Sequence, residues 1–198
     1  MRITRFHFPS TVLGLALLAV MILPACSVNV QKEKNGEDKQ VDIDTPVGGI
    51  HVHKDADVAD TGLTVYPGAR LKQGNHDGDD KSANVNISGF GFGVKVVALE
   101  YESNDAPSKV IAFYRDQLNK FGKVLECHTS NHLDVSANFN DDSDKNSHAP
   151  TCTGNGGNNV ELKVGTRENQ HIVAIEPDGK GSSFSLVYVR THGKEADI

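Results

Sequence analysis

Hydrophobic and polar residues alternate in several separate stretches of the chain, which is the side-chain period of a β-strand. The alternation or β-branched content is strongest at 94–103, 123–128, 160–165, 171–176 and 184–190. Turn residues such as Pro177-Asp178-Gly179 separate the last of these stretches. We therefore expect them to form an antiparallel sheet of about five strands.

One segment between these strands has the period of a helix instead. Its apolar stripe consists of Val110, Tyr114, Leu118 and Phe121. Asp105 is placed to cap this helix, Pro107 is tolerated in its first turn, and Gly122 can end it. The predicted fold class is therefore α+β: one amphipathic helix packed on the sheet, in a domain that spans residues 63–192.

The segment from residue 26 to residue 62 differs in composition from this domain. Residues 41–53 alternate and are interrupted at Pro46-Val47-Gly48-Gly49, which predicts a small β-hairpin, with a linker to residue 62. An isolated hairpin is only marginally stable, so it must dock on something. Residues 26–40 are mostly polar and mixed in charge, as in a solvated tether, and residues 193–198 form a short tail.

The first 25 residues form an export signal. Arg2 and Arg5 precede an uncharged, mainly apolar run of 13 residues at 11–23, and Leu23-Pro24-Ala25-Cys26 follows. A membrane-spanning helix needs about 20 apolar residues, so this run is too short to cross a bilayer.

The Leu-Pro-Ala-Cys sequence resembles the lipobox of bacterial lipoproteins, in which a Leu and a small residue precede the Cys. The resemblance implies cleavage before Cys26, lipidation of that cysteine and a membrane anchor. Ser27 in place of Asp implies an outer-membrane location facing the periplasm. More than one acyl chain makes such an anchor stable. The alternative is an ordinary secretory signal followed by a chance cysteine.

Composition narrows the possible partners of the mature chain. Cleavage removes two arginines and takes the formal net charge from −6 to −8. An acidic chain does not suit nucleic acid, whose phosphates require clustered Lys and Arg. The chain contains no Trp and only four Tyr, which argues against a large aromatic platform for carbohydrate.

The remaining cysteines, Cys127 and Cys152, allow two interpretations. Outside the cytoplasm two thiols normally pair, so we expect a disulfide that closes a loop of about 25 residues. The alternative is a zinc site, because Cys127, His132, His148 and Cys152 have the donor set of a structural zinc centre.

Other residues that could bind a metal ion form weaker sequence patterns. His51 and His53 lie two apart on a predicted strand, so they share a face, but the sequence shows no third ligand and we expect them to be exposed to solvent. Two acidic loops are candidates for calcium, but the second has Ser147 and Thr153 in place of the Gly and terminal Glu of a calcium loop, so we expect solvated loops. These loops contain Asp77, Asp79, Asp80, Asp141, Asp142 and Asp144.

Motifs of catalysis are not evident in the sequence. Gly89-x-Gly91-x-Gly93 lacks the ending of a dinucleotide fingerprint and leads into a strand, and no serine lies in Gly-x-Ser-x-Gly. We expect Phe90 and Phe92 to be buried beneath the helix, because large apolar side chains usually lie inside. Exposed rings there would instead indicate a contact surface.

Two stretches resemble a further pattern. Val65-Tyr-Pro-Gly-Ala69, and Tyr101–Val110 running into Phe113, Tyr114 and Leu118, are similar to a set of small uncharacterised bacterial lipoproteins. The resemblance covers residues 63–128 and implies a fold but no activity. We therefore expect a non-enzymatic envelope lipoprotein without a cofactor. Its expected partners are the membrane, through Cys26, and an envelope protein; a periplasmic zinc-binding protein is the alternative.

Overall fold

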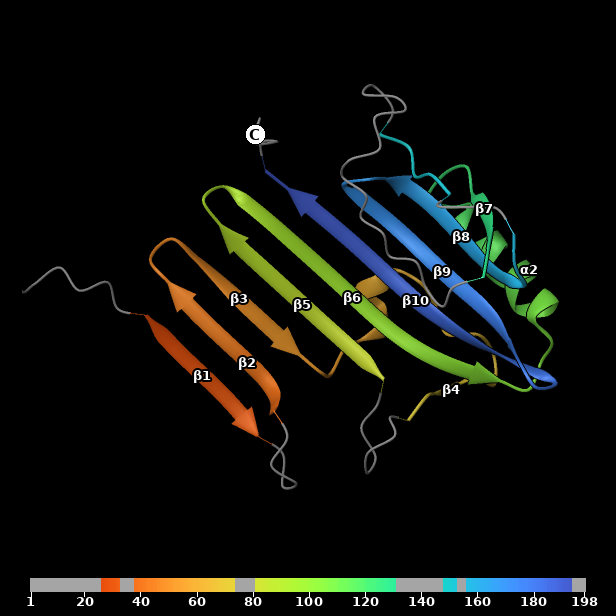
Figure 1. The fold of residues 1–198 in the computed structure, drawn as a ribbon, viewed down its shortest axis with the longest axis horizontal. Helices are drawn as coiled ribbons and strands as arrows, with labels where there is room; N and C mark the ends of the chain where they lie inside the picture. Colours follow the sequence, from red (N-terminus) through yellow and green to blue (C-terminus); the bar gives the residue numbers. More distant parts are fainter. Residues whose placement is uncertain (1–25, 33–37, 74–80, 131–147, 153–155, 194–198) are drawn as a thin grey trace, which may run out of the picture.

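The computed structural model describes residues 26–32, 38–73, 81–130, 148–152 and 156–193. In this part of the chain, ten strands form one antiparallel sheet and one α-helix lies on it (Figure 1). The strands are β1 (Ser27–Lys32), β2 (Asp38–Thr45), β3 (Gly48–His53), β4 (Arg70–Leu71), β5 (Ser82–Gly89), β6 (Phe92–Ser103), β7 (Leu125–Thr129), β8 (Asn159–Thr166), β9 (Asn169–Asp178) and β10 (Gly181–His192).

Neighbouring strands in the sheet follow the order β1-β2-β3-β5-β6-β10-β9-β8-β7, and β4 pairs with β6 beside the end of β5. Two-residue turns join β2 to β3, β5 to β6, β8 to β9 and β9 to β10, as in an antiparallel meander. The long strands β6 and β10 pair along their whole length, from Gly93↔His192 to Ser103↔Ser182, and hold the two halves of the sheet together.

The expected sheet of about five strands is wrong. The N-terminal hairpin is not a separate unit, because β3 pairs with β5 from Gly48↔Gly89 to His53↔Asn84 and so continues the main sheet. Residues 27–32, which we expected in the tether, form the edge strand β1 and pair with β2. Val28 and Val30 alternate with polar residues there, but the polar composition of the segment hid that short alternation.

Helix α2 (Pro107–Leu118) covers one face of the sheet at the β8, β9 and β10 side (Figure 1). Val110, Tyr114 and Leu118 are fully buried, as the stripe predicted, whereas Phe121 lies beyond the helix and is partly exposed. The N-cap is Ala106, without a side-chain hydrogen bond. Asp105 does not cap the helix; its carboxylate accepts hydrogen bonds from Tyr66 and Lys109.

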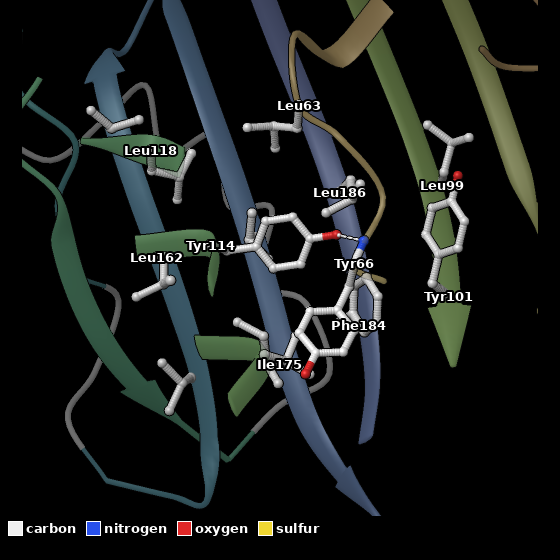
Figure 2. Packing of buried hydrophobic residues seen from close by; sticks show 14 of the residues in the cluster. Leu63, Tyr66, Leu99, Tyr101, Tyr114, Leu118, Leu162, Ile175, Phe184 and Leu186 are labelled. Atoms are coloured by element: carbon white, nitrogen blue, oxygen red, sulfur yellow. Dashed lines mark hydrogen bonds between the residues drawn. The ribbon is translucent and has the colours of Figure 1, made fainter. Parts of the chain in front are cut away.

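The loop between β3 and β4 completes this core. It contains the short 3-10 helix η2 (Val58–Thr61) and brings Leu63 and Tyr66 onto the sheet beside α2. Figure 2 shows Tyr114 reaching from the helix to the backbone of Tyr66, among the side chains of several strands. The strand residues of this cluster are Val97, Leu99, Tyr101, Val160, Leu162, Val164, Val173, Ile175, Phe184 and Leu186.

Among the described residues, no helix combines the length and apolar character needed to cross a membrane.

Candidate functional site

The face of the sheet opposite α2 carries a continuous apolar surface. One row crosses six neighbouring strands as consecutive register partners: Val30, Val41, Val52, Val85, Val96 and Val189. A second row crosses five: Val28, Ile43, Ile50, Ile87 and Val94. Because alternate residues of a strand point to the same face, Phe92 on β6 joins these rows. We call these twelve residues the open face.

Much of the open face is accessible to solvent. Val28 is 63% exposed, Phe92 47%, Ile50 41% and Ile87 38%, so no described segment covers this region. Toward β10 the face runs into a second buried cluster, in which Val96 packs against Val187 and Val189. Cross-strand pairs of β-branched residues stabilise the sheet itself.

Two hairpin turns extend the apolar surface at one end of the sheet. The β2–β3 turn exposes 55% of Val47, and the β5–β6 turn exposes 91% of Phe90. The Phe90 N–H donates a hydrogen bond to the Val47 carbonyl at 3.2 Å, so the turns lie side by side. Our expectation that Phe90 and Phe92 lie beneath the helix is wrong, because Phe90 occupies a turn and Phe92 is on the opposite face.

Cys26 lies at this same end of the sheet. It directly precedes β1, and Ser27 pairs with Asp44 just before the β2–β3 turn. Figure 1 shows the start of β1 and both turns along one edge of the view, at the upper left. The Cys26 side of the molecule therefore presents Val28, Val47 and Phe90 together.

The other face of β2 and β3 is polar. The predicted pair His51 and His53 does share a face, and the sequence analysis missed its neighbours Asp42 and Asp44. His51 Nδ1 lies 2.9 Å from Asp42 Oδ1 and its Nε2 lies 3.4 Å from Asp44 Oδ1. His53 Nε2 lies 3.4 Å from Asp42 Oδ1. The alternation of Asp42 and Asp44 with Val41 and Ile43 was the signal that could have found them.

The carboxylate of Asp42 is the centre of this polar group. The hydrogen bond from His51, followed by one from Gln40, favours the ionised form and lowers the pKa of Asp42 below its usual value. Within the described ranges, no group of three or more His, Cys, Asp or Glu side chains is arranged to hold a metal ion. The histidines are instead engaged with carboxylates.

Cys127 and Cys152 form the expected disulfide, with their Cα atoms 5.5 Å apart. The bridge ties edge strand β7 to the segment 148–152. Both sulfurs are used in this bond, so they are not free thiolates for zinc. His148 Nδ1 lies 2.8 Å from Glu168 Oε1, and His132 lies outside the described residues.

A buried ion pair lies beside the disulfide. Lys163 Nζ is 2.9 Å from Glu161 Oε2, and both side chains are almost completely buried. Lys163 also donates to the Thr151 carbonyl at 3.5 Å, and Glu161 is the register partner of Cys127. The pair therefore holds the 148–152 segment against the sheet. The two charged groups are paired with each other, as buried charges usually are.

An apolar hollow of about 500 Å³ lies between the end of α2, β7 and the 148–152 segment. Its lining includes Phe121, Val124, Leu125 and Pro150, with Lys123 as the titratable side chain. A single amine supplies no acid–base pair. The two acidic loops that we considered for calcium, with Asp77, Asp79, Asp80, Asp141, Asp142 and Asp144, lie outside the described residues.

Comparison with protein-family models, curated proteins and solved structures found no match to this chain.

Proposed function

We propose that this protein is a lipid-anchored lipoprotein of the bacterial cell envelope. In this proposal it acts as a non-enzymatic binding or accessory structural module, and the open face is its binding surface. The observation that carries the proposal is the exposure of the open face. Monomeric soluble proteins rarely expose large continuous apolar patches, and those that do usually bind another molecule there.

The anchor rests on the N-terminal sequence. Leu23-Pro-Ala-Cys26 follows a short apolar run, and the proposed cleavage would make Cys26 the first residue of the mature chain. The Cys127–Cys152 disulfide supports an oxidising compartment outside the cytoplasm. The proposed location is the outer membrane, with the domain facing the periplasm.

We assign binding, and not catalysis, to the open face because of the chemistry of its side chains. Val, Ile and Phe provide neither a nucleophile nor a group for proton transfer. Their apolar surface does favour binding, because burying it contributes a free energy of roughly 25 cal/mol per Å².

Acylation of Cys26 tests the anchor. We expect the full chain, expressed in a bacterium with two membranes, to fractionate with the outer membrane and to carry the mass of acyl chains on its first residue. Cys26→Ser should abolish both results and leave an unacylated chain. A wild-type chain that is cleaved elsewhere, or recovered unacylated in the soluble fraction, would refute the lipoprotein assignment.

Photo-crosslinking in living cells tests the binding surface. A photoreactive amino acid at Ile50 should give defined adducts, because this side chain lies exposed on the open face. The matched control is the same substitution at His51, the next residue of β3, which points to the polar face. Equal adduct yields at the two positions would contradict a specific role for the open face.

A further inference from the structure

We propose that the molecule covering the Cys26 end of the open face is the lipid bilayer itself. The β2–β3 and β5–β6 turns would insert Val47 and Phe90 into the membrane interface, and Val28 and Phe92 would lie against the lipid beside them. This inference rests on the proposed function, because the lipid anchor on Cys26 holds this end of the sheet at the membrane.

Cys26 joins the sheet without a linker. Cys26 is followed directly by Ser27, the first residue of β1. A strand advances about 3.3 Å per residue, so Val28 lies only about 7 Å along the chain from Cys26. Acyl chains on Cys26 therefore bring β1 to the bilayer surface, and the sheet has no tether on which to move away.

Four strongly exposed apolar side chains lie at the same end of the sheet as Cys26. Val28, Val47, Phe90 and Phe92 are exposed by 63%, 55%, 91% and 47%, and all four lie at the Cys26 end of the sheet (Figure 1). Large apolar side chains on one side of an anchored protein are typical of interfacial membrane binding.

The backbone of the β5–β6 turn has an unusual conformation. Phe90 and Gly91 both have positive φ, of 50° and 83°. Hairpin turns with two positive φ values favour Asn, Asp or Gly, and a bulky residue in this region is strained. With 91% of Phe90 exposed, packing within the described chain does not offset that strain. Burial of the ring in lipid would offset it.

The polarity of the side chains on this face of the sheet changes along β6. From the Cys26 end, the residues that share this face are Phe92, Val94, Val96, Ala98, Glu100 and Glu102. Glu100 lies 2.8 Å from Lys72 and 3.3 Å from Lys81, and Glu102 lies 3.0 Å from Arg70. The charged groups are thus at the far end of the strand, where water remains available to them.

A second copy of the chain packed on the open face would explain this surface less completely. Two sheets packed face to face cover side chains that project from the strands. Val47 and Phe90 lie in turns beyond the strand ends, so a facing sheet would leave the most exposed ring in water. A bilayer that meets the sheet at this end covers both turns.

The chain contains no Trp, so a single introduced tryptophan reports its own surroundings. The test uses Phe90→Trp in the full, acylated chain, reconstituted into phosphatidylethanolamine and phosphatidylglycerol vesicles with or without brominated acyl chains. The matched control is Lys180→Trp in the β9–β10 turn, at the opposite end of the sheet. Val47→Trp is a second reporter, should Phe90→Trp fail to fold.

We expect the tryptophan emission of the Phe90→Trp variant to shift to shorter wavelength in vesicles. Brominated lipid should quench this emission several-fold more strongly than the emission of the Lys180→Trp variant. Equal, weak quenching of the two variants, in acylated chains that float with the vesicles, would overturn the inference and leave the anchor intact.

The remaining outcomes separate the alternatives. A Phe90→Trp variant whose emission is neither shifted nor quenched, together with dimers captured by chemical crosslinking, would overturn the inference in favour of a second copy. Recovery of the chain without acyl groups on an intact Cys26 would refute the proposed anchor. Quenching of the Phe90→Trp variant in that unacylated chain would still support lipid docking, and a lack of quenching there would refute both proposals.

Discussion

Tyr114 joins three parts of the molecule at one buried residue. Its ring lies on α2, packs near Phe184 of β10 and is completely buried. Its hydroxyl oxygen accepts a hydrogen bond of 3.0 Å from the backbone N–H of Tyr66, in the loop before β4 (Figure 2). Burial raises the pKa of the Tyr114 hydroxyl above its usual value, so the group stays neutral. The helix, the loop and the sheet therefore share this contact.

We expect Tyr114→Phe to lower the free energy of unfolding by about 1–3 kcal/mol, because it leaves the buried Tyr66 N–H without an acceptor. Urea denaturation measures the change. Tyr188→Phe is the control: within the described residues its hydroxyl has no hydrogen bond, and the expected change is about 0.5 kcal/mol or less. Equal losses in the two variants would show that the hydroxyl of Tyr114 contributes nothing specific.

His171 is the histidine of the described chain whose pKa is clearly affected by burial. Its ring stacks on Phe121 with 4.0 Å between ring centroids, and its Nδ1 donates to the Thr61 carbonyl at 2.8 Å. Desolvation is the largest effect and lowers the pKa below the ordinary value of 6.5, although the hydrogen bond acts in the opposite direction. The folded chain thus binds a proton at this site less readily than the unfolded chain.

We predict that His171 makes the protein less stable as the pH falls below 6.5. In that range the unfolded state binds the proton first, so the free energy of unfolding decreases until the folded-state pKa is reached. His171→Asn can keep a donor near the Nδ1 position but cannot titrate. Urea denaturation at pH 8 and pH 5 should show a smaller loss in the variant than in the wild type. An equal or larger loss in the variant would contradict this assignment.

At the scale of single elements, α2 was the most predictable part of the chain. Its apolar stripe and Pro107 are local signals, and both indicated the correct helix. The predicted N-cap was wrong because the carboxylate of Asp105 is engaged by Lys109 and by the hydroxyl of Tyr66, which is distant in sequence. Pairing across 39 residues has no local signature in the sequence.

Edge strand β7 pairs with β8 and is additionally held by the disulfide. Cys127 of β7 is bonded to Cys152, and the side chain of Lys163 reaches the Thr151 carbonyl from β8. The bond closes a loop of 25 residues in the unfolded chain. Closing a loop of this length lowers the entropy of the unfolded state, which stabilises the folded state by about 3 kcal/mol.

We expect the Cys127→Ala, Cys152→Ala double variant to lose about 3 kcal/mol of unfolding free energy relative to the oxidised wild type. Urea denaturation of the wild type with and without reductant provides the matched comparison, and the reduced protein should approach the double variant. A reduced protein as stable as the oxidised one would mean that the bond does not restrain the unfolded chain.

At the scale of the whole molecule, the number of strands could not be read from local patterns. The β2–β3 hairpin was predicted, but its pairing with β5 depends on a match between Ile50, Val52 and Val85, Ile87 that only the register reveals. The open face was missed for the same reason. Each of its strands contributes one to three apolar residues, and their continuity exists only after six strands are aligned.

The two halves of the sheet also differ in how they are stabilised. The first buried cluster consists of residues of the loop before β4, β4 itself, α2, Val124, β6, β8, β9 and β10, and the second of residues of β6, β9 and β10. No apolar side chain of β1, β2 or β3 belongs to either. The N-terminal strands are held by their own ladders and by the pairing of β3 with β5. Regions with little burial open more readily than the core.

Hydrogen exchange measured by mass spectrometry should reveal this difference. In detergent solution, we expect the amides of β1, β2 and β3 to exchange much faster than those of β9 and β10, because local opening of the first three strands exposes little buried apolar surface.

The same chain in lipid vesicles should show slower exchange around Val28, Val47 and Phe90, since docking adds apolar contacts at that end of the sheet. The turn at Lys180, remote from Cys26, should exchange equally in detergent and vesicles. Uniform protection across the sheet in detergent would mean that all ten strands unfold as one unit, and the weak apolar contacts of the N-terminal half would then not limit its stability.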